Sequence, residues 1–321
     1  MESSAVAASA AEATAAPRER RRLRLPLHWS APVAYFVVLA IVVAFKGLPT
    51  SRDALFFWIL LGLLAASATN LRRLFRGILL DWLPFGFILF AYDLLRGYAD
   101  ELFDAHVLPQ LRADEILFGT VPTVWLQERL WDGPARIDWI DYASWSVYIT
   151  HFFATFVVAG CLWLFASHLF RRYIAAVSLL AVAGFVTYAL FPAVPPWMAS
   201  REGFLPPSDR IVGFVSDAVP VSTFGALWEG GTRYANDVAA MPSLHAAYAM
   251  LICLFFWRAA GWAWRVPLVA YSAAMGFALV YTSEHYVSDV LAGWLFAGAA
   301  LAVVELASRR LAARRLISGR A

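Results

Sequence analysis

Long apolar runs separated by short polar segments are the main pattern of this chain. A helix needs about 20 mostly apolar residues to cross a bilayer. Eight runs reach or approach that length, and they lie at 31–48, 54–70, 77–95, 140–166, 173–191, 243–257, 264–282 and 286–306. The second and sixth runs are short, and prolines end the fifth sharply. The pattern predicts an all-α, polytopic integral membrane helix bundle with about eight transmembrane helices.

The composition agrees with a membrane protein. Apolar residues make up 61% of the chain and charged residues only 15%, which is far from the balance of a soluble domain. Residues 1–25 are rich in Ala and then Arg, with no cleavage site before the first apolar run, so we expect a disordered cytosolic tail. A single membrane-embedded domain is expected over 26–306, followed by a basic cytosolic tail over 307–321.

The distribution of arginine indicates an orientation. With the N-terminus in the cytoplasm, 17 of the 26 basic residues fall on inner loops and tails, as the positive-inside rule requires. Both termini are therefore expected in the cytoplasm, and the long loops 96–139 and 192–242 on the extracytoplasmic side. Apolar spacing at 104–111 and 123–131 predicts short interfacial helices in the first of these loops.

His285 and Asp289 are spaced four residues apart at the start of the last apolar run, so a helix would place them on one face. A carboxylate that accepts a hydrogen bond from one ring nitrogen fixes the tautomer and leaves the other nitrogen to act as a nucleophile or base. The alternative is an interfacial histidine beside an aspartate that the helix dipole stabilises.

The stretch Pro242-Ser243-Leu244-His245 opens the sixth apolar run. Proline fits a first helical turn, and the free N–H groups at such a turn favour a phosphate or similar anion. Ser243 would add a hydroxyl donor, and His245 would supply a proton to a leaving oxygen. The alternative is a capped helix with an interfacial histidine. Because both motifs lie on the same predicted face, the sequence favours one shared site.

Three further residues are candidates for binding an anionic substrate. Arg233 and Arg96 lie on the predicted outer side, and a guanidinium can hold phosphate oxygens with its planar fork. Arg96 could equally extend its charge to the membrane interface. His151 lies well inside the fourth apolar run, either as a hydrogen-bonded packing residue or as part of a substrate cavity.

Taken together, Pro242-Ser243-x-His245 and His285-x-x-x-Asp289 resemble the second and third signature motifs of the type 2 phosphatidic acid phosphatase superfamily of membrane lipid phosphatases and phosphotransferases. Tyr92–Arg96, Tyr148–His151 and Pro192–Trp197 look like one branch of it. That branch includes the fungal inositol phosphorylceramide synthases, which are targets of aureobasidin, and bacterial relatives. The similarity covers roughly 85–305.

The resemblance implies specific roles for the motif residues. His285 would be the nucleophile that forms a phosphohistidine, Asp289 would orient it, His245 would be the general acid and Ser243 a phosphate ligand. The family's first motif, a Lys followed by Arg-Pro, is absent, and Ala278-Leu279 stands where a Ser-Arg pair is usual. Both departures fit the inositol-phosphotransferase branch and leave Arg233 and Arg96 as substitutes for the phosphate clamp.

We therefore expect a metal-independent and cofactor-free lipid phosphotransferase or phosphatase of the plasma membrane, with its site on the extracytoplasmic face. Its substrate would be a lipid phosphate or phospholipid, its acceptor water, an alcohol or a lipid, and no nucleic acid would take part. One alternative is a phosphatase for lipid phosphates or polyprenyl phosphates and diphosphates. Another is a transporter or scaffold, which the scarcity of charge at the span centres disfavours.

Overall fold

The computed structural model describes residues 27–46, 52–67, 71–96, 103–219 and 236–318. Their regular secondary structure is helical apart from isolated bridges, which confirms the all-α prediction. The expected tail over 1–25 and Arg233 lie outside the described residues. The elements are α2 (Leu27–Lys46), α3 (Arg52–Ala66), α4 (Leu71–Gly77), the π-helix η1 (Ile78–Trp82), α5 (Leu83–Arg96), α6 (Leu108–Phe118), α7 (Pro122–Leu130), α8 (Trp139–Phe165), α9 (Ser167–Leu190), α10 (Pro196–Arg201), α11 (Ile211–Ala218), α13 (Leu244–Phe256), α14 (Trp262–Tyr281) and α15 (Val287–Ser318).

Helices of two lengths form the apolar part of the molecule. Within the described ranges, five stretches are long and apolar enough to cross a bilayer: Leu74–Tyr92, Trp139–Phe165, Ser167–Leu190, Trp262–Tyr281 and Val287–Arg314. Three of the predicted runs give shorter apolar helices, at Ser30–Phe45, Phe57–Ala66 and Leu244–Phe256. The chain is thus a polytopic membrane helix bundle in which five of the eight predicted runs have spanning length.

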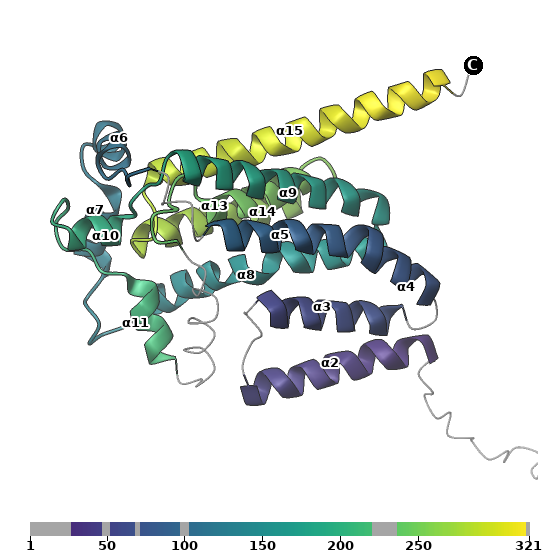
Figure 1. The fold of residues 1–321 in the computed structure, drawn as a ribbon. Coiled ribbons are helices and arrows are strands. Elements are labelled where there is room, and N and C mark those ends of the chain that lie inside the picture. Colours follow the sequence, from purple (N-terminus) through teal and green to yellow (C-terminus); the bar gives the residue numbers. More distant parts are fainter. Residues whose placement is uncertain (1–26, 47–51, 68–70, 97–102, 220–235, 319–321) are drawn as a thin grey trace, which may run out of the picture.

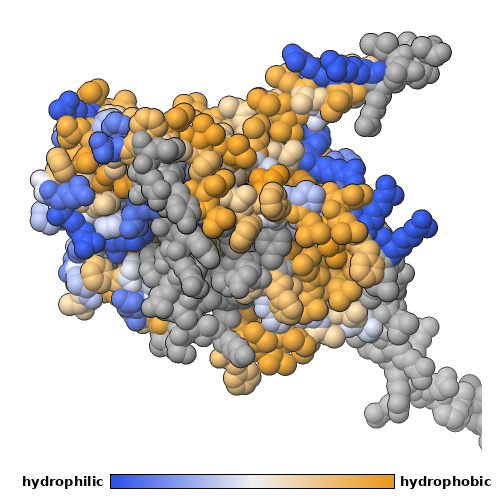
Figure 2. Space-filling model, viewed as in Figure 1, coloured by the Kyte–Doolittle hydropathy of each residue, from blue (hydrophilic) through white to orange (hydrophobic). Residues whose placement is uncertain are grey.

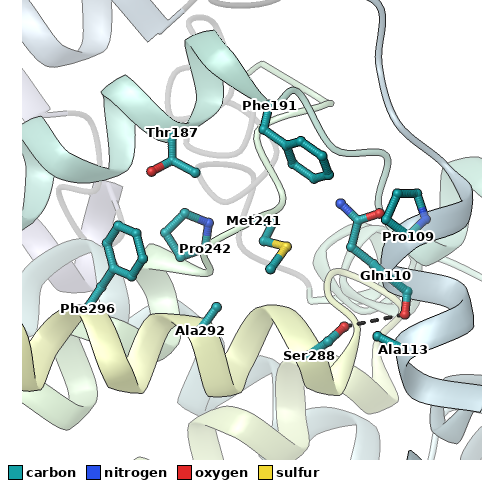
Figure 3. Close-up of a pocket in the computed structure, with 10 residues that line it drawn as sticks. All are labelled: Pro109, Gln110, Ala113, Thr187, Phe191, Met241, Pro242, Ser288, Ala292 and Phe296. Carbon is teal, nitrogen blue, oxygen red and sulfur yellow. Dashed lines mark hydrogen bonds between the residues drawn. The ribbon is translucent and has the colours of Figure 1, made fainter. Parts of the chain in front are cut away.

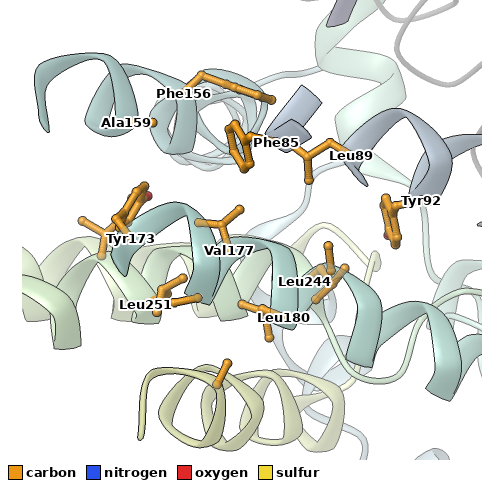
Figure 4. Packing of buried hydrophobic residues seen from close by; sticks show 14 of the residues in the cluster. Phe85, Leu89, Tyr92, Phe156, Ala159, Tyr173, Val177, Leu180, Leu244 and Leu251 are labelled. Atoms are coloured by element: carbon orange, nitrogen blue, oxygen red, sulfur yellow. The ribbon is translucent and has the colours of Figure 1, made fainter. Parts of the chain in front are cut away.

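The helix α13 lies at the centre of this bundle and contacts α8, α9, α14 and α15 (Figure 1). Fully buried alanines such as Ala176, Ala181 and Ala247 allow the helices to approach closely. Larger side chains fill the remaining space, with Val177 and Leu180 of α9 beside residues of α13 (Figure 4). Apolar residues also cover the outer sides of the bundle, as expected for surfaces in contact with lipid (Figure 2).

Polar elements gather at the two ends of the bundle. At one end lie the short helices α6, α7, α10 and α11 (Figure 1). At the other end Arg171 pairs with Asp81 at 3.0 Å, and Glu305 lies within 3.8 Å of three arginines, which are Arg172, Arg258 and Arg309. The helix α15 continues past Leu306 to Ser318, so most of the predicted basic tail is helical.

One of the two predicted interfacial helices has different bounds. The second prediction is confirmed by α7, whereas the first helix, α6, begins at Leu108 and not at Asp104. Pro109 explains the shift because proline fits the first turn of a helix. The preceding His106 is extended instead and bonds through its N–H to the oxygen of Pro192 at 2.8 Å.

Candidate active site

A left-handed turn at the end of α14 places the residues before α15. The N–H of Ser283 bonds to the oxygen of Val280, and that of Glu284 to the oxygen of Leu279, which is the hydrogen-bond pattern of a Schellman motif. Ser283 has a φ of 67°, a conformation that costs a non-glycine residue about 1 kcal/mol. Its buried hydroxyl lies 3.1 Å from the Ser208 hydroxyl, so side-chain contacts hold the turn that presents His285.

His285 and Asp289 face each other, as their spacing predicts. The Nδ1 atom of His285 lies 3.5 Å from Oδ2 of Asp289, and both side chains are buried. Oδ2 also accepts a hydrogen bond of 2.9 Å from the N–H of Tyr286, which fixes the carboxylate. A separation of 3.5 Å is long for a hydrogen bond, but such catalytic contacts commonly shorten when substrate binds.

Asp114 of α6 caps the start of α15. Its two carboxylate oxygens accept hydrogen bonds of 2.9 Å from the N–H groups of Val287 and Ser288. Burial raises the pKa of Asp114 above its ordinary value, although these N–H donors act in the opposite direction. Asp114 and Asp289 therefore occupy the N–H groups at the start of α15, and the start of α13 is the better place for a substrate anion.

Ser243 is the N-cap of α13 and lies completely buried. Its Oγ accepts a hydrogen bond of 3.3 Å from the N–H of Ala246, which confirms that it caps the helix. A hydroxyl that accepts a hydrogen bond can still donate its own proton, so this cap is compatible with phosphate binding. The preceding Pro242 is fixed through its oxygen by the Tyr188 hydroxyl at 2.7 Å.

Three histidines meet at the start of α13. The ring centroid of His245 lies 5.7 Å from that of His285 and 3.8 Å from that of His151. Tyr148 also stacks on His245, with ring centroids 5.0 Å apart and planes inclined by 19°. His151 is therefore part of the same cluster. In the described part of the chain, no group of His, Cys, Asp and Glu side chains is arranged to hold a metal ion.

Neither predicted arginine can be placed at the site. Arg96 is the last residue of α5, but its side chain, like all of Arg233, is outside what the structure describes. Arg210, like Asp114, was not among the residues predicted from the sequence. Its Nε and Nη2 atoms donate hydrogen bonds of 2.7 and 3.1 Å to the two carboxylate oxygens of Glu284, the neighbour of His285.

Arg210 is held in place on several sides. Its guanidinium lies 4.8 Å from the ring centroid of Trp197. Burial alone would lower the pKa of Arg210, but the carboxylate of Glu284 outweighs it and leaves the pKa above its ordinary value. The side chain is therefore a permanent cation, paired with the residue that precedes His285.

The helix α7 braces the loop that carries Arg210. Gln127 donates to the backbone oxygen of Asp209 and accepts from its N–H, both at 2.8 Å. The indole N–H of Trp131 donates to the Asp209 carboxylate, also at 2.8 Å. The only sequence signal for Arg210 was its place among the basic residues of the predicted outer side, which did not distinguish it from the others.

The molecule is a bundle of apolar helices with a buried histidine and aspartate at one end. This is the architecture of an integral membrane protein whose buried side chains are suited to acid–base or nucleophilic chemistry. The family model of the PAP2 superfamily matches residues 117–303, more than half of the chain and including both histidine motifs. The chain belongs to the PAP2 superfamily, which confirms the resemblance that the motifs indicated.

Three curated proteins are similar to part of the chain. The phosphoinositol dihydroceramide synthase of Bacteroides thetaiotaomicron is 34% identical over 35% of this chain and 40% of its own length. The inositol phosphorylceramide synthase of Candida albicans is 25% identical over 48% and 34%, respectively. The catalytic subunit of the corresponding synthase of Schizosaccharomyces pombe is 26% identical over 49% and 38%. The chain thus matches less than half the length of each relative, and no solved structure matches it.

Proposed function

We propose that the protein is an inositol-phosphotransferase-like membrane enzyme that moves a phospho-headgroup from a phospholipid to a lipid alcohol through a phosphohistidine at His285. The observation that carries this proposal is the 5.7 Å separation of the His245 and His285 rings. One phosphoryl centre fits between two such rings and lies within hydrogen-bonding or bonding reach of each. The names of the three similar proteins, all synthases of phosphoinositol lipids, support transfer over hydrolysis.

In the first step, Nε2 of His285 attacks the phosphorus and the bond to the leaving lipid oxygen breaks. His245 gives its proton to that oxygen, while Asp289 holds the Nδ1 proton of His285 and stabilises the charged ring. In the second step, the acceptor hydroxyl loses its proton to His245 and attacks the phosphorus, and the N–P bond breaks. Both histidines then return to their starting protonation states.

Charge on the phosphoryl oxygens is met by groups of this chain. Arg210 supplies the cation, and Ser243 with the N–H groups at the start of α13 supplies aligned donors. This set of donors makes the proposed reaction metal-independent. Water reaching the phosphohistidine would make the same residues a phosphatase, so the acceptor distinguishes the two outcomes.

We place the site at the extracytoplasmic face of the plasma membrane, with both termini in the cytoplasm. The arginines around Glu305 support this orientation, because they lie at the end of the bundle away from the histidines. Lipid alcohols and phospholipids of the outer leaflet would then reach the site directly.

The test uses the full-length protein in vesicles that contain a phospholipid labelled at its phosphorus, with and without ceramide or diacylglycerol. A new labelled phospholipid that appears only with the lipid alcohol supports transfer, whereas release of a water-soluble labelled product alone contradicts it. His285→Ala and His245→Ala should each abolish turnover. His168→Ala, an exposed histidine at the start of α9, is the matched control and should retain it.

A further inference from the structure

An apolar cavity of about 330 Å³ lies beside the histidine site, between α6, the end of α9 and α15 (Figure 3). This volume lies within the range of small-ligand pockets, roughly 300–1,000 Å³. Its walls are mostly hydrocarbon, with Phe191, Met241, Ala292 and Phe296 among the lining residues. Because the neighbouring Leu190 and Leu295 are exposed on the lipid-facing surface, an alkyl chain is the natural occupant.

One polar side chain of this cavity is unsatisfied. Gln110 of α6 is 1% exposed, and neither its amide oxygen nor its amide nitrogen has a hydrogen-bond partner among the described residues. Figure 3 shows its amide beside the cavity, directed toward Phe191 and Met241. A buried amide without partners is unfavourable, because the hydrogen bonds to water that each polar group gave up are not replaced. A ligand that supplied both a donor and an acceptor would recover that cost.

The cavity also has a defined direction relative to the site. Its lining runs along α15 from Ser288 to Phe296, which is about 12 Å at the rise of an α-helix. Ser288 is next to Asp289, and Pro242 in the same lining is next to Ser243. A chain lying along α15 with its polar end at Ser288 and Pro242 would therefore have that end next to residues that adjoin the site in sequence.

We propose that this cavity binds the alkyl chain of a long-chain N-acyl amino alcohol, with Gln110 hydrogen-bonded to the polar part of that lipid. The proposal rests on the proposed function, in which such an alcohol is the acceptor. An N-acyl amino alcohol offers an amide N–H, a carbonyl and hydroxyls, which match the donor and acceptor of Gln110. The ester groups of diacylglycerol only accept hydrogen bonds, and its one hydroxyl is the reacting group, so it leaves the Gln110 oxygen without a donor and the amide selects against it.

The first test compares acceptors in vesicles with a fixed phospholipid donor. Gln110→Met keeps the length of the side chain and removes its hydrogen bonds. It should lower the ratio of kcat/KM for the N-acyl amino alcohol to that for diacylglycerol about tenfold, the effect of one or two lost hydrogen bonds. Thr187→Val is the matched control in the same lining, because the Thr187 hydroxyl is already bonded to the oxygen of Ala183 at 2.9 Å. An unchanged ratio in Gln110→Met overturns the proposal.

The second test does not depend on turnover. An N-acyl amino alcohol with a photoreactive group at the end of its acyl chain should attach to residues around Phe296 and Met241 in the wild-type protein. Gln110→Met and Ala292→Phe, which fills the cavity from α15, should each reduce this labelling. Labelling elsewhere, or labelling that both variants leave intact, overturns the proposal. If the wild-type protein transfers to neither acceptor, the proposed function fails and the labelling result still decides the cavity.

Discussion

The N–H of Ser243 donates a hydrogen bond of 3.0 Å to the backbone oxygen of Asp289, so the two motifs of the site are joined through their main chains. Gly293, one turn further along α15, makes this approach possible. A Cβ atom at Gly293 would lie closer than 3.0 Å to the backbone oxygen of Ser243, a separation that real side chains do not show. The distance between His245 and His285 therefore depends on the absence of a side chain at residue 293.

We predict that Gly293→Ala retains the fold but loses most of its activity. The added methyl group must push α13 away from α15, which moves His245 relative to His285. A displacement near 1 Å at a catalytic group lowers the rate about 100-fold. Initial rates of headgroup transfer, measured with the purified variant in vesicles, check this prediction.

Gly298→Ala is the matched control, because it lies on the same helix and a Cβ there would meet only Leu254 at an ordinary contact distance of 3.9 Å. It should retain wild-type activity. Equal activity in both alanine variants would show that the close contact at Gly293 does not set the geometry of the site.

Asp289→Asn tests whether the carboxylate orients His285. The amide keeps an oxygen to accept the N–H of Tyr286, but it removes the charge and favours the wrong imidazole tautomer. We expect kcat to fall by about 10²- to 10⁴-fold with little change in KM. Asp132→Asn, on an exposed surface, should leave kcat unchanged. A change in KM alone would assign Asp289 to substrate binding.

The sequence could predict the helical class and the pairing of His285 with Asp289, because both depend on short-range spacing. It could not identify Arg210 or Asp114. These residues reach the site from 74 and 173 positions away, across loops whose path no local pattern determines. The predicted bounds of α6 were wrong for a related reason. The apolar spacing before Pro109 resembled a helix, but the helix begins only at Leu108, where the proline fits its first turn.

Arg210 gives a prediction about substrate binding. Replacing it with Ala alone would leave the buried Glu284 without its partner, which is strongly destabilising, so the test uses Arg210→Met with Glu284→Gln. We expect the double variant to fold and to lose about 10²- to 10³-fold in kcat/KM, as for removal of one donor to a phosphoryl oxygen. Glu284→Gln alone separates the contribution of the acid. The single variant Arg210→Lys should retain only part of the wild-type activity, because lysine lacks the planar fork of arginine.

Arg129→Ala is the control for general loss of positive charge on the same face. Arg129 is half exposed, lies 4.2 Å from the ring centroid of Trp125 and pairs with Glu128, not with Glu284. Activity comparable to the wild-type protein is expected. If Arg129→Ala lowered kcat/KM as much as the Arg210 variant does, overall charge and not a clamp at the site would explain the loss.

The orientation of the bundle can be measured with single cysteines. Glu202 in the loop after α10 and His168 at the start of α9 are both exposed and lie at opposite ends of the molecule. In a background with Cys161 and Cys253 replaced by Ala, Glu202→Cys should react with an impermeant thiol reagent on intact cells. His168→Cys should react only after permeabilisation. The reverse pattern would place the histidine site in the cytoplasm.

Asp114 gives a prediction about pH and stability. Its pKa is raised by burial in the folded protein, so the folded state holds a proton that the unfolded state releases above about pH 4. The stability associated with this proton is fully present below that pH and is lost as the pH rises through the folded pKa. The apparent Tm of the wild-type protein should therefore fall relative to that of Asp114→Asn as the pH is raised from about 4. Thermal unfolding in detergent across a pH series measures the difference. A difference that stayed constant with pH would mean that the two N–H donors of α15 balance the burial of the carboxyl group, and a change in the opposite direction would mean that they outweigh it.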